Sequence, residues 1–534
     1  MSVLSYACAA FALAQLAPPP EPPENLRTPA KTLLGKALFW DEQLSSDNTM
    51  ACGTCHRPRS GGADPRMTRL AGPDGVAGNA DDVFGSAGVI AMDANGDFRP
   101  SATFGFGRQA TGRFAQDFLG AAWSTTNFWD GRASTTFIDP QTGAKSIARG
   151  GALESQLVGP PVSNIEMAHA ARTFDQIAAK LARVRPLALS PKLTSDLAAA
   201  LATGRRYPDL FADAFGTSAV TSERIAFAIA SYERSLVPDR TPWDLAQVGE
   251  PNALSPDERA GLAIFTNGVR CSICHPPPTF ADDAFHNLGL RPPGEDLGRA
   301  KVTGDPADRG RFKTPSLRNA GLRGRFMHNG GLATLGEVID FYDRGGGFPD
   351  NRDPLLRPLH LTLKEKGQLL AFLDHGLTDP RVAAEVAPFD RPMLRSESGP
   401  DPTIFGEPTL GSGGHAPTMI AASPPNLGND AFQFGVSGAL GGAQAFLLLS
   451  GETTDDAYEY AREFPVYVEL ALAPVIVPRL LLGAGDGGGY ATVELPLPDD
   501  IALVGQRGYA QWLVLDPGAA GGVCVSEGAC FTLF

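Results

Sequence analysis

The sequence predicts a mainly α protein built from two similar domains, followed by an all-β domain at the C-terminus. Three observations predict this division. The chain of 534 residues is too long for one hydrophobic core. The pattern G-x-A-x-F occurs twice on helical apolar spacing, at 35–39 and at 261–265. Beyond about residue 417 the pattern changes to short β-type runs separated by Gly and Pro.

The N-terminal 25 residues predict a leader and a Pro-rich spacer. Residues 3–16, "VLSYACAAFALAQL", are apolar and contain the candidate cleavage site Ala12-Leu13-Ala14. A basic n-region is missing, so a disordered N-terminal tail is the alternative. We favour export, which predicts a periplasmic or secreted protein.

Charge and hydropathy limit the choice of partners. The net charge is −14 and the pI about 5.1, which argues against nucleic acid. The sequence contains no apolar run long enough for a transmembrane helix.

Two pentapeptides carry the chemistry, "CGTCH" at 52–56 and "CSICH" at 271–275. C-x-x-C-H is the signature of c-type haem attachment, in which both thiols bond the haem and the His binds iron. A zinc half-site is the alternative, although zinc does not require a His directly after the second Cys. We therefore predict two covalent haem c groups in cytochrome c-like domains over 26–245 and 246–391. The residues that hold them are Cys52, Cys55, His56, Cys271, Cys274 and His275.

Two capping boxes mark helix starts in the second domain. "SPDE" at 255–258 precedes the second G-x-A-x-F pattern, and "TLGE" at 334–337 opens another helix. In the latter helix Leu335, Val338, Ile339 and Tyr342 fall on one face. Tyr342 therefore ends an inward-facing stripe.

Further motifs resemble the bacterial di-haem cytochrome c peroxidase/MauG family. These are "FWDGRA" (128–133), "ALESQLVGPPVSNIEM" (152–167), "FKTPSLRN" (312–319) and "HNGGLATLGEVIDFYDRGG" (328–346), so the resemblance covers about residues 26–380. It implies that the N-terminal haem binds peroxide and that the C-terminal haem stores or relays electrons. It also implies catalytic roles for Glu166, Gln156 and Pro160 beside the first haem, and for Trp129 between the haems. A stretch at about 135–151, longer than in short family members, predicts a hairpin or loop at the rim of the active site.

The resemblance also bears on the sixth ligand of each iron. Many family members carry a His after the first motif that blocks the peroxide site, whereas this chain has none between His56 and His169. Met67 lies in a Gly/Asp-rich segment that reads as a surface loop, so we expect an open first haem. At the second haem, the family's ligand position fourteen residues after the motif His falls on Tyr342. Met327 is the alternative ligand.

The family also places a Ca²⁺ between the haems. Its ligands would be the carbonyls of Arg323 and Arg325 with the amide of Gln109. Residues 72–82 and 92–97 are Asp/Asn/Gly loops that resemble Ca²⁺ loops, although such turns are commoner without metal.

The C-terminal third predicts a linker over 392–416 and a β-sandwich over 417–534. Cys524 and Cys530 flank "VSEGA", which reads as a hairpin that a disulfide could close. No function for this domain can be inferred from its sequence.

The sequence thus predicts an exported di-haem peroxidase that reduces H₂O₂ and oxidises a protein or other electron donor. Two alternatives remain. One is a di-haem electron-transfer cytochrome without peroxidase activity, and the other is a conventional cytochrome c peroxidase fed by a small cytochrome.

Overall fold

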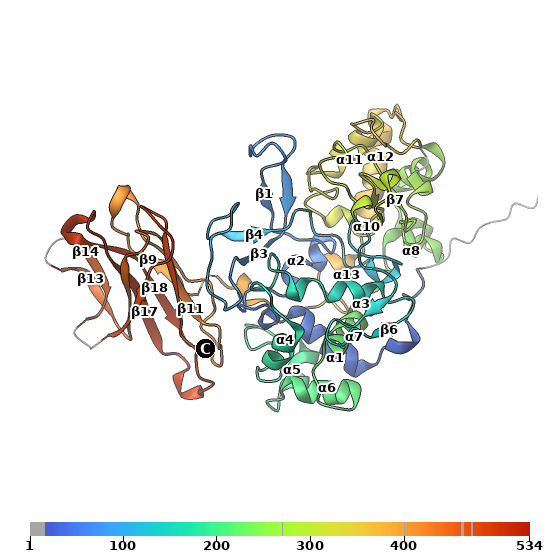
Figure 1. Ribbon diagram of the computed structural model, residues 1–534. Coiled ribbons are helices and arrows are strands. Elements are labelled where there is room, and N and C mark those ends of the chain that lie inside the picture. The colour runs from blue at the N-terminus through green and yellow to red at the C-terminus, as the bar shows by residue number, and fades with distance from the viewer. Residues whose placement is uncertain (1–15, 270, 400, 461–463, 471–473) are drawn as a thin grey trace, which may run out of the picture.

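The computed structural model describes residues 16–534 except 270, 400, 461–463 and 471–473. The expected leader over residues 1–14 lies outside this range. The described chain forms a β-strand region at one end and two helical, loop-rich parts beside each other (Figure 1). Helices account for only 29% of the chain, so the expectation of a mainly α fold is not confirmed. Long loops with little helix, such as 92–134, account for much of the difference.

The first part contains eight helices and three short hairpins among its described residues. The helices are α1 (Pro29–Trp40), α2 (Cys52–Cys55), α3 (Ala152–Leu157), α4 (Phe174–Leu181), α5 (Ser195–Leu201), α6 (Tyr207–Phe215), α7 (Ser222–Glu233) and, from later in the chain, α13 (Pro380–Ala383), whose Val382 lies in the same core. The hairpins are β1 (Thr68–Leu70) with β2 (Val83–Gly85), β3 (Ala87–Ile90) with β4 (Arg108–Ala110), and β5 (Phe137–Ile138) with β6 (Lys145–Ile147). The last of these is the hairpin expected near 135–151. It packs on α7, where the Phe137 and Phe227 rings lie 6.0 Å apart.

The second part repeats the helical plan on a smaller scale. Its helices are α8 (Pro242–Gln247), whose Trp243 lies in the core of this part, α9 (Pro256–Ala263), α10 (Ala300–Thr303), α11 (Leu335–Asp343) and α12 (Leu363–Ala371), with π-turns at Ile264–Gly268 and Phe372–Gly376. β7 (Phe285–His286) pairs with β8 (Phe312–Lys313). Both expected N-caps are present, because the Ser255 and Thr334 side chains accept from the N–H groups of Glu258 and Glu337. The capping box is complete only at Ser255, since Glu337 accepts from the N–H of Ala333 and not of Thr334.

The two G-x-A-x-F patterns make equivalent helix crossings. A Cβ on Gly35 of α1 would lie 1.9 Å from the carbonyl oxygen of Ala228 in α7. A Cβ on Gly261 of α9 would lie 2.0 Å from the carbonyl oxygen of Gln368 in α12. In each part a glycine therefore lets two helix backbones touch, which supports a duplicated plan.

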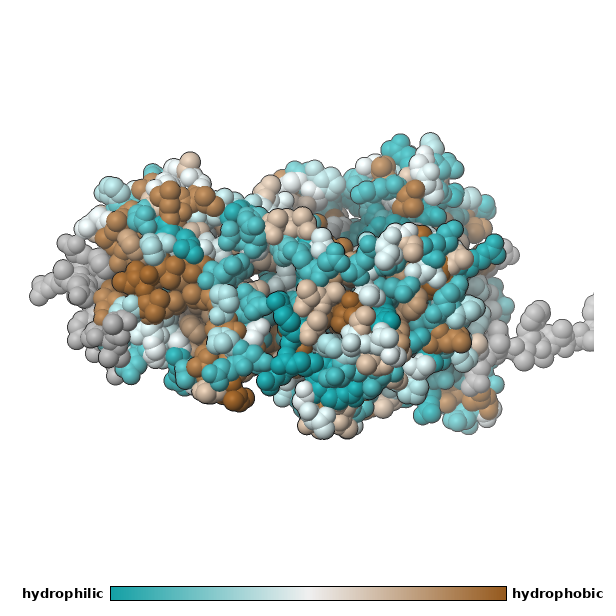
Figure 2. Space-filling model, turned by 60° about the horizontal axis from the view of Figure 1, so that its bottom comes forward, coloured by the Kyte–Doolittle hydropathy of each residue, from teal (hydrophilic) through white to brown (hydrophobic). Residues whose placement is uncertain are grey.

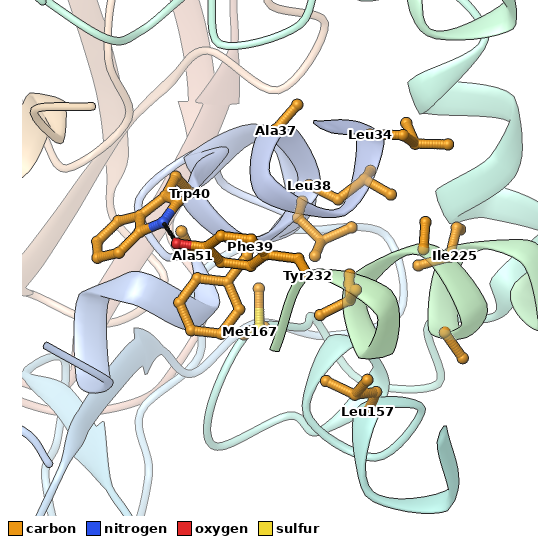
Figure 3. Packing of buried hydrophobic residues seen from close by; sticks show 14 of the residues in the cluster. Leu34, Ala37, Leu38, Phe39, Trp40, Ala51, Leu157, Met167, Ile225 and Tyr232 are labelled. Carbon is orange, nitrogen blue, oxygen red and sulfur yellow. Dashed lines mark hydrogen bonds between the residues drawn. The ribbon is translucent and has the colours of Figure 1, made fainter. Parts of the chain in front are cut away.

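The core of the first part surrounds the α1–α7 crossing. Leu34, Leu38 and Ile225 are fully or almost fully buried there. The Trp40 Nε1 donates to the Tyr232 hydroxyl at 3.0 Å, which satisfies the polar atoms of two buried rings (Figure 3). This core supports α2, which carries the first C-x-x-C-H motif.

The C-terminal region forms a β-sandwich. One sheet has the order β10-β11-β16 and the other β15-β12-β17-β18-β9, with all pairs antiparallel. Phe434 and Val493 of the first sheet and Leu447 and Trp512 of the second share one buried core. The strands are β9 (Thr403–Phe405), β10 (Thr418–Ile420), β11 (Gln433–Ala439), β12 (Gln444–Ser450), β15 (Val475–Leu480), β16 (Gly489–Glu494), β17 (Arg507–Leu515) and β18 (Val523–Thr532), with β13 (Thr453–Tyr460) and β14 (Phe464–Val468) as a separate hairpin. β9 thus comes from the segment expected to be the linker.

The predictions of a hairpin at "VSEGA" and of a disulfide that closes it are wrong. Cys524 and Cys530 are both free and both belong to the single strand β18. An extended strand rises about 3.3 Å per residue, so six residues separate the two thiols too far for a bond. Gly528, which suggested a turn, instead makes room for the ring of Phe405, since a Cβ there would lie 2.7 Å from it.

The sandwich contacts the loop between β3 and β4 of the first part. Phe98 N–H donates to the Thr492 hydroxyl at 2.9 Å, and Gln433 Nε2 donates to the Met92 sulfur at 3.7 Å. The Phe106 and Tyr490 rings lie 5.2 Å apart. Apolar residues also gather on the outer surface of the sandwich (Figure 2).

Candidate active site

One cavity of about 1520 Å³ lies between the two helical parts and reaches both C-x-x-C-H motifs. Its volume exceeds the range of about 300–1,000 Å³ that suits one small ligand. Most of the residues proposed from the sequence line it: Cys52, Cys55, His56, Trp129, Gln156, Pro160, Glu166, Cys271, Cys274, His275, Arg323, Arg325, Met327 and Tyr342. The structure therefore brings both predicted haem sites and their predicted distal residues into one space.

The first motif is held rigidly at the end of a short helix. Cys52 and Cys55 form α2, and His56 follows as its C-cap. His56 Nδ1 lies 3.1 Å from the Gly62 carbonyl oxygen. Because a carbonyl only accepts hydrogen bonds, Nδ1 carries the proton and Nε2 is left with its lone pair free for a metal.

The second motif repeats this arrangement. His275 Nδ1 donates to the Phe280 carbonyl oxygen at 2.9 Å. Burial lowers the pKa of both histidines, so their rings stay neutral, as a metal ligand requires. All four motif cysteines are free rather than paired as disulfides. These donor sets fit two covalently attached haems.

Three residues form the wall nearest the first motif. Gln156 lies in α3, Pro160 begins the 3₁₀ turn Pro160–Val162, and Glu166 follows in the next turn. Burial raises the pKa of the Glu166 carboxyl, while a hydrogen bond from Ser163 and the charge of Arg132 oppose the rise. The Glu166 charge in turn acts on the thiols of Cys52 and Cys55, so this carboxyl belongs to the first site.

Trp129 lies on the cavity wall between the two halves of the chain. Its Nε1 donates to the Phe114 carbonyl oxygen at 2.8 Å. Its carbonyl accepts from the N–H of Lys313, also at 2.8 Å. Trp129 is therefore bound to both halves, through its ring to the first and through its backbone to the second.

Helix α11 presents its expected face to the second motif. Leu335, Val338, Ile339 and Tyr342 all line the cavity. Burial raises the pKa of the Tyr342 phenol, and charge on Cys271 and Cys274 adds to the rise. Tyr342 therefore faces the cavity, as its position in the stripe predicts, and lies near the cysteines of the second motif. Met327, the alternative ligand, also lines the cavity.

Comparison with known proteins agrees with this geometry. The family model for di-haem cytochrome c peroxidase matches residues 29–252. The methylamine utilization protein MauG of Methylorubrum extorquens is 30% identical over 364 residues, which are 68% of this chain and 82% of MauG. The chain belongs to the di-haem cytochrome c peroxidase/MauG family.

A second relative gives the same assignment, and one solved structure shows a similar fold. The cytochrome-c peroxidase IdrP1 of Pseudomonas sp. strain SCT is 30% identical and covers 74% of this chain and 89% of its own length. A crystal structure of a MauG-like protein associated with microbial copper homeostasis matches with a TM-score of 0.51 and 24% identity, over 70% of this chain and 96% of that one. The protein is thus an oxidoreductase that acts on peroxide, and its family implies two haem c groups.

The three residues expected to bind calcium do not all line the cavity. Arg323 and Arg325 line the cavity, whereas Gln109 is not among its lining residues. The Gln109 amide nitrogen instead donates to the Asn164 carbonyl. Calcium binding stays a prediction.

Sequence reasoning missed Glu233, a carboxyl that lines the cavity at the end of α7. Burial raises its pKa to about 8, helped by Glu154 and Asp117 and opposed by Arg234. The sequence does contain a sign of this residue, because Glu233 directly follows the apolar run "IAFAIASY" at 225–232, and an acidic residue is unusual in a segment expected to be buried.

His286 was also left without a role. It lies between two carboxylates, with Nδ1 2.6 Å from Asp353 and Nε2 2.9 Å from Asp282. Asp282 lies four residues before His286, whereas Asp353 is 67 residues away and is brought there only by the fold.

In the described chain, no helix has the length and apolar character needed to cross a membrane.

Proposed function

We propose that the protein is an exported, MauG-like di-haem peroxidase that reduces H₂O₂ at the His56 haem. The oxidising equivalents gained there would be shared with the second haem and used on a protein or other electron donor. The observation that carries the proposal is the single cavity that joins both C-x-x-C-H motifs to Glu166, Trp129 and Tyr342. Export is inferred because c-type haem is attached outside the cytoplasm.

When bound, the haems supply the redox chemistry of peroxide cleavage and electron storage. The protein's own part begins at Glu166. We assign its carboxylate to take a proton from one oxygen of the peroxide and to return it to the other oxygen, which leaves as water. Gln156 orients the peroxide through its amide, and Pro160 supplies an apolar, non-donating surface beside it. Reduction to two waters consumes two protons and two electrons per peroxide, and the external donor supplies the electrons.

The half-buried position of Glu166 supports this role. A carboxyl with a raised pKa holds its proton more readily near neutral pH than an exposed glutamate does. It can therefore both accept the proton and return it. The absence of any histidine between His56 and His169 supports a first haem site that no histidine from this segment would block.

We assign Tyr342 as the sixth ligand of the His275 haem. A phenolate ligand favours the higher oxidation states of iron, whereas a Met thioether favours the ferrous state. Such a haem suits the storage of oxidising equivalents better than the acceptance of electrons from a cytochrome. Trp129, fixed to both halves, provides an oxidisable ring between the two sites.

Low-temperature EPR of the purified ferric protein, followed by peroxide titration, tests the proposal. We expect one high-spin, five-coordinate haem and one low-spin haem, with rapid reaction on addition of H₂O₂. Two low-spin six-coordinate haems that do not react would contradict it and favour an electron-transfer cytochrome. A Met-ligated second haem with a high potential would favour the conventional peroxidase.

A further inference from the structure

We propose that Arg323 is a positioning residue that couples the two haem-binding histidines to each other. The proposal rests on the assignment of His56 and His275 as iron ligands and goes beyond it, because the hydrogen bonds of Arg323 reach neither histidine. The evidence for it is a similar hydrogen-bond arrangement behind each histidine, together with the contacts that Arg323 makes beside both arrangements.

The same branched hydrogen bond occurs behind each histidine. The Gly62 carbonyl accepts from His56 Nδ1 at 3.1 Å and from the Phe118 N–H at 3.3 Å. The Phe280 carbonyl accepts from His275 Nδ1 at 2.9 Å and from the Leu317 N–H at 3.3 Å. Each ligand is thus oriented by a carbonyl that a second segment of backbone holds in place.

Arg323 binds beside three of the four backbone groups in these two arrangements, those of Gly62, Phe118 and Leu317. Its Nε donates to the carbonyl of Gly61, directly before Gly62, at 3.2 Å. Its Nη2 donates to the carbonyls of Ser316 and Arg318, on either side of Leu317, at 3.1 and 3.2 Å. The same nitrogen lies 3.1 Å from Asp117 Oδ2, directly before Phe118.

Asp117 completes the link on the first side. Its other oxygen accepts from the N–H groups of Leu119 and Gly120 at 2.7 and 3.3 Å, which fixes the turn that carries Phe118. The Arg323 and Asp117 side chains are only 9% and 4% exposed. Water therefore screens the pair weakly, and small displacements of either group change its energy.

The consequence is a mechanical link between the two irons that is separate from Trp129. A hydrogen bond to the far nitrogen of a ligating histidine orients the ring and raises its basicity toward the metal. A displacement of Arg323 moves the backbone on both sides, so it alters both ligand bonds together.

The test uses the full-length protein with both haems attached and two variants, Asp117→Asn and Arg323→Lys. Asp117→Asn keeps the size of the side chain, removes its charge and replaces one acceptor oxygen with an N–H donor. Resonance Raman measures the iron–histidine stretch of the ferrous first haem, and EPR measures the g values of the ferric second haem. We expect both signals to shift in each variant, with both haems retained.

Arg318→Lys is the matched control. Arg318 is equally buried, and its guanidinium binds Asp244 and the carbonyls of Pro238 and Pro278, all on the side of the second haem. We expect this change to shift the second haem's signal alone.

A shift at one haem only, or at neither, in folded Asp117→Asn or Arg323→Lys protein would overturn the coupling. This outcome differs from failure of the proposed function. A protein with two low-spin haems that ignore peroxide would refute the peroxidase mechanism, yet EPR of both haems would still show whether Arg323 couples them.

Discussion

The indole of Trp129 and the imidazole of His328 lie edge to face, with ring centroids 6.4 Å apart. They occupy equivalent places in two turns of the same shape. Phe128 and Met327, directly before them, have φ of +66° and +71°, and Gly131 and Gly330, two residues after, have φ of +69° and +64°. The peptide of Phe114 joins the turns, since its carbonyl accepts from Trp129 Nε1 and its N–H donates to the His328 carbonyl, each at 2.8 Å.

Trp129→Phe should slow electron transfer between the haems while leaving both haem spectra unchanged. Phe is much harder to oxidise and cannot donate to the Phe114 carbonyl. An added barrier of ~1.4 kcal/mol slows the step about tenfold. Rapid mixing of the half-reduced protein with H₂O₂ measures the rate. Trp123→Phe, a change away from the cavity, should have no effect, and equal slowing in both variants would count against Trp129.

The dependence of activity on pH should report Glu166. Proton acceptance needs the carboxylate form, and burial raises the Glu166 pKa, so kcat/KM for peroxide should fall on acidification through a midpoint above 4.5. Glu166→Gln should lower kcat/KM by about 100- to 10,000-fold and remove this acid limb. The exposed Glu250→Gln serves as the control. A limb that persists in Glu166→Gln belongs to another group.

Tyr342→Phe should change the optical and EPR spectra of the second haem and raise its midpoint potential, because an anionic oxygen ligand is lost. Met327→Leu should leave both unchanged. Spectra and potentiometric titrations of the two variants decide the ligand. If only Met327→Leu alters the second haem, Met327 is the ligand and Tyr342 a packing residue.

Glu397 should contribute to resistance against acid unfolding. Its burial opposes ionisation, but Arg391 binds it through two nitrogens at 2.7 and 2.9 Å and Arg57 at 2.6 Å, which lowers its pKa to about 2. A lowered folded-state pKa gives stability that is fully present above about pH 4.5 and is lost as the pH falls towards 2. After allowance for solvent, the contribution is at most about 2 kcal/mol.

Denaturant unfolding of Glu397→Gln at pH 7 and pH 3 measures this contribution. The difference in unfolding free energy from the unchanged protein should be larger at pH 7 than at pH 3. Glu24→Gln, an exposed carboxyl, provides the comparison. An equal difference at both pH values would show that the charge of Glu397 is not the cause.

Gly35→Ala and Gly261→Ala should each destabilise the helix crossing in which they lie. The added methyl would meet a backbone carbonyl at about 2 Å, and forced overpacking typically costs about 1–3 kcal/mol. Gly367→Ala is the control, since nothing lies within 4 Å of a Cβ at this position in α12. It should stabilise the protein by up to about 1 kcal/mol through helix propensity. Thermal unfolding of the three variants distinguishes the two signs.

The local chemistry was predictable because short sequences dictate it. The two C-x-x-C-H motifs, the helix caps at Ser255 and Thr334, and the cavity-facing stripe that ends at Tyr342 all depend on residues close in the chain. The position of Glu166 beside the first motif came only from the family resemblance, since its own turn contains no signal for catalysis.

The features that were not predicted depend on contacts between residues far apart in the sequence. The contacts of Arg323 with Gly61 and Asp117 span more than two hundred positions, and no local pattern encodes them. The disulfide between Cys524 and Cys530 was predicted wrongly because the segment between them, which contains Gly528, resembles a turn. In the structure Gly528 lies within a strand, where the absence of a side chain leaves room for the Phe405 ring. The mainly α expectation was not confirmed because loops held by side-chain contacts have no periodicity to detect.

The contact between Phe98 and Thr492 spans 394 residues and has a consequence for the order of folding. The Met92 carbonyl in the same loop accepts from the N–H of Ala170, four residues beyond Glu166. The hydrogen bond from Phe98 in this loop to Thr492 cannot form until the β-sandwich has been synthesised. The loop beside the first haem-attachment motif, although encoded early, therefore gains this contact only once the C-terminal region of the chain has folded.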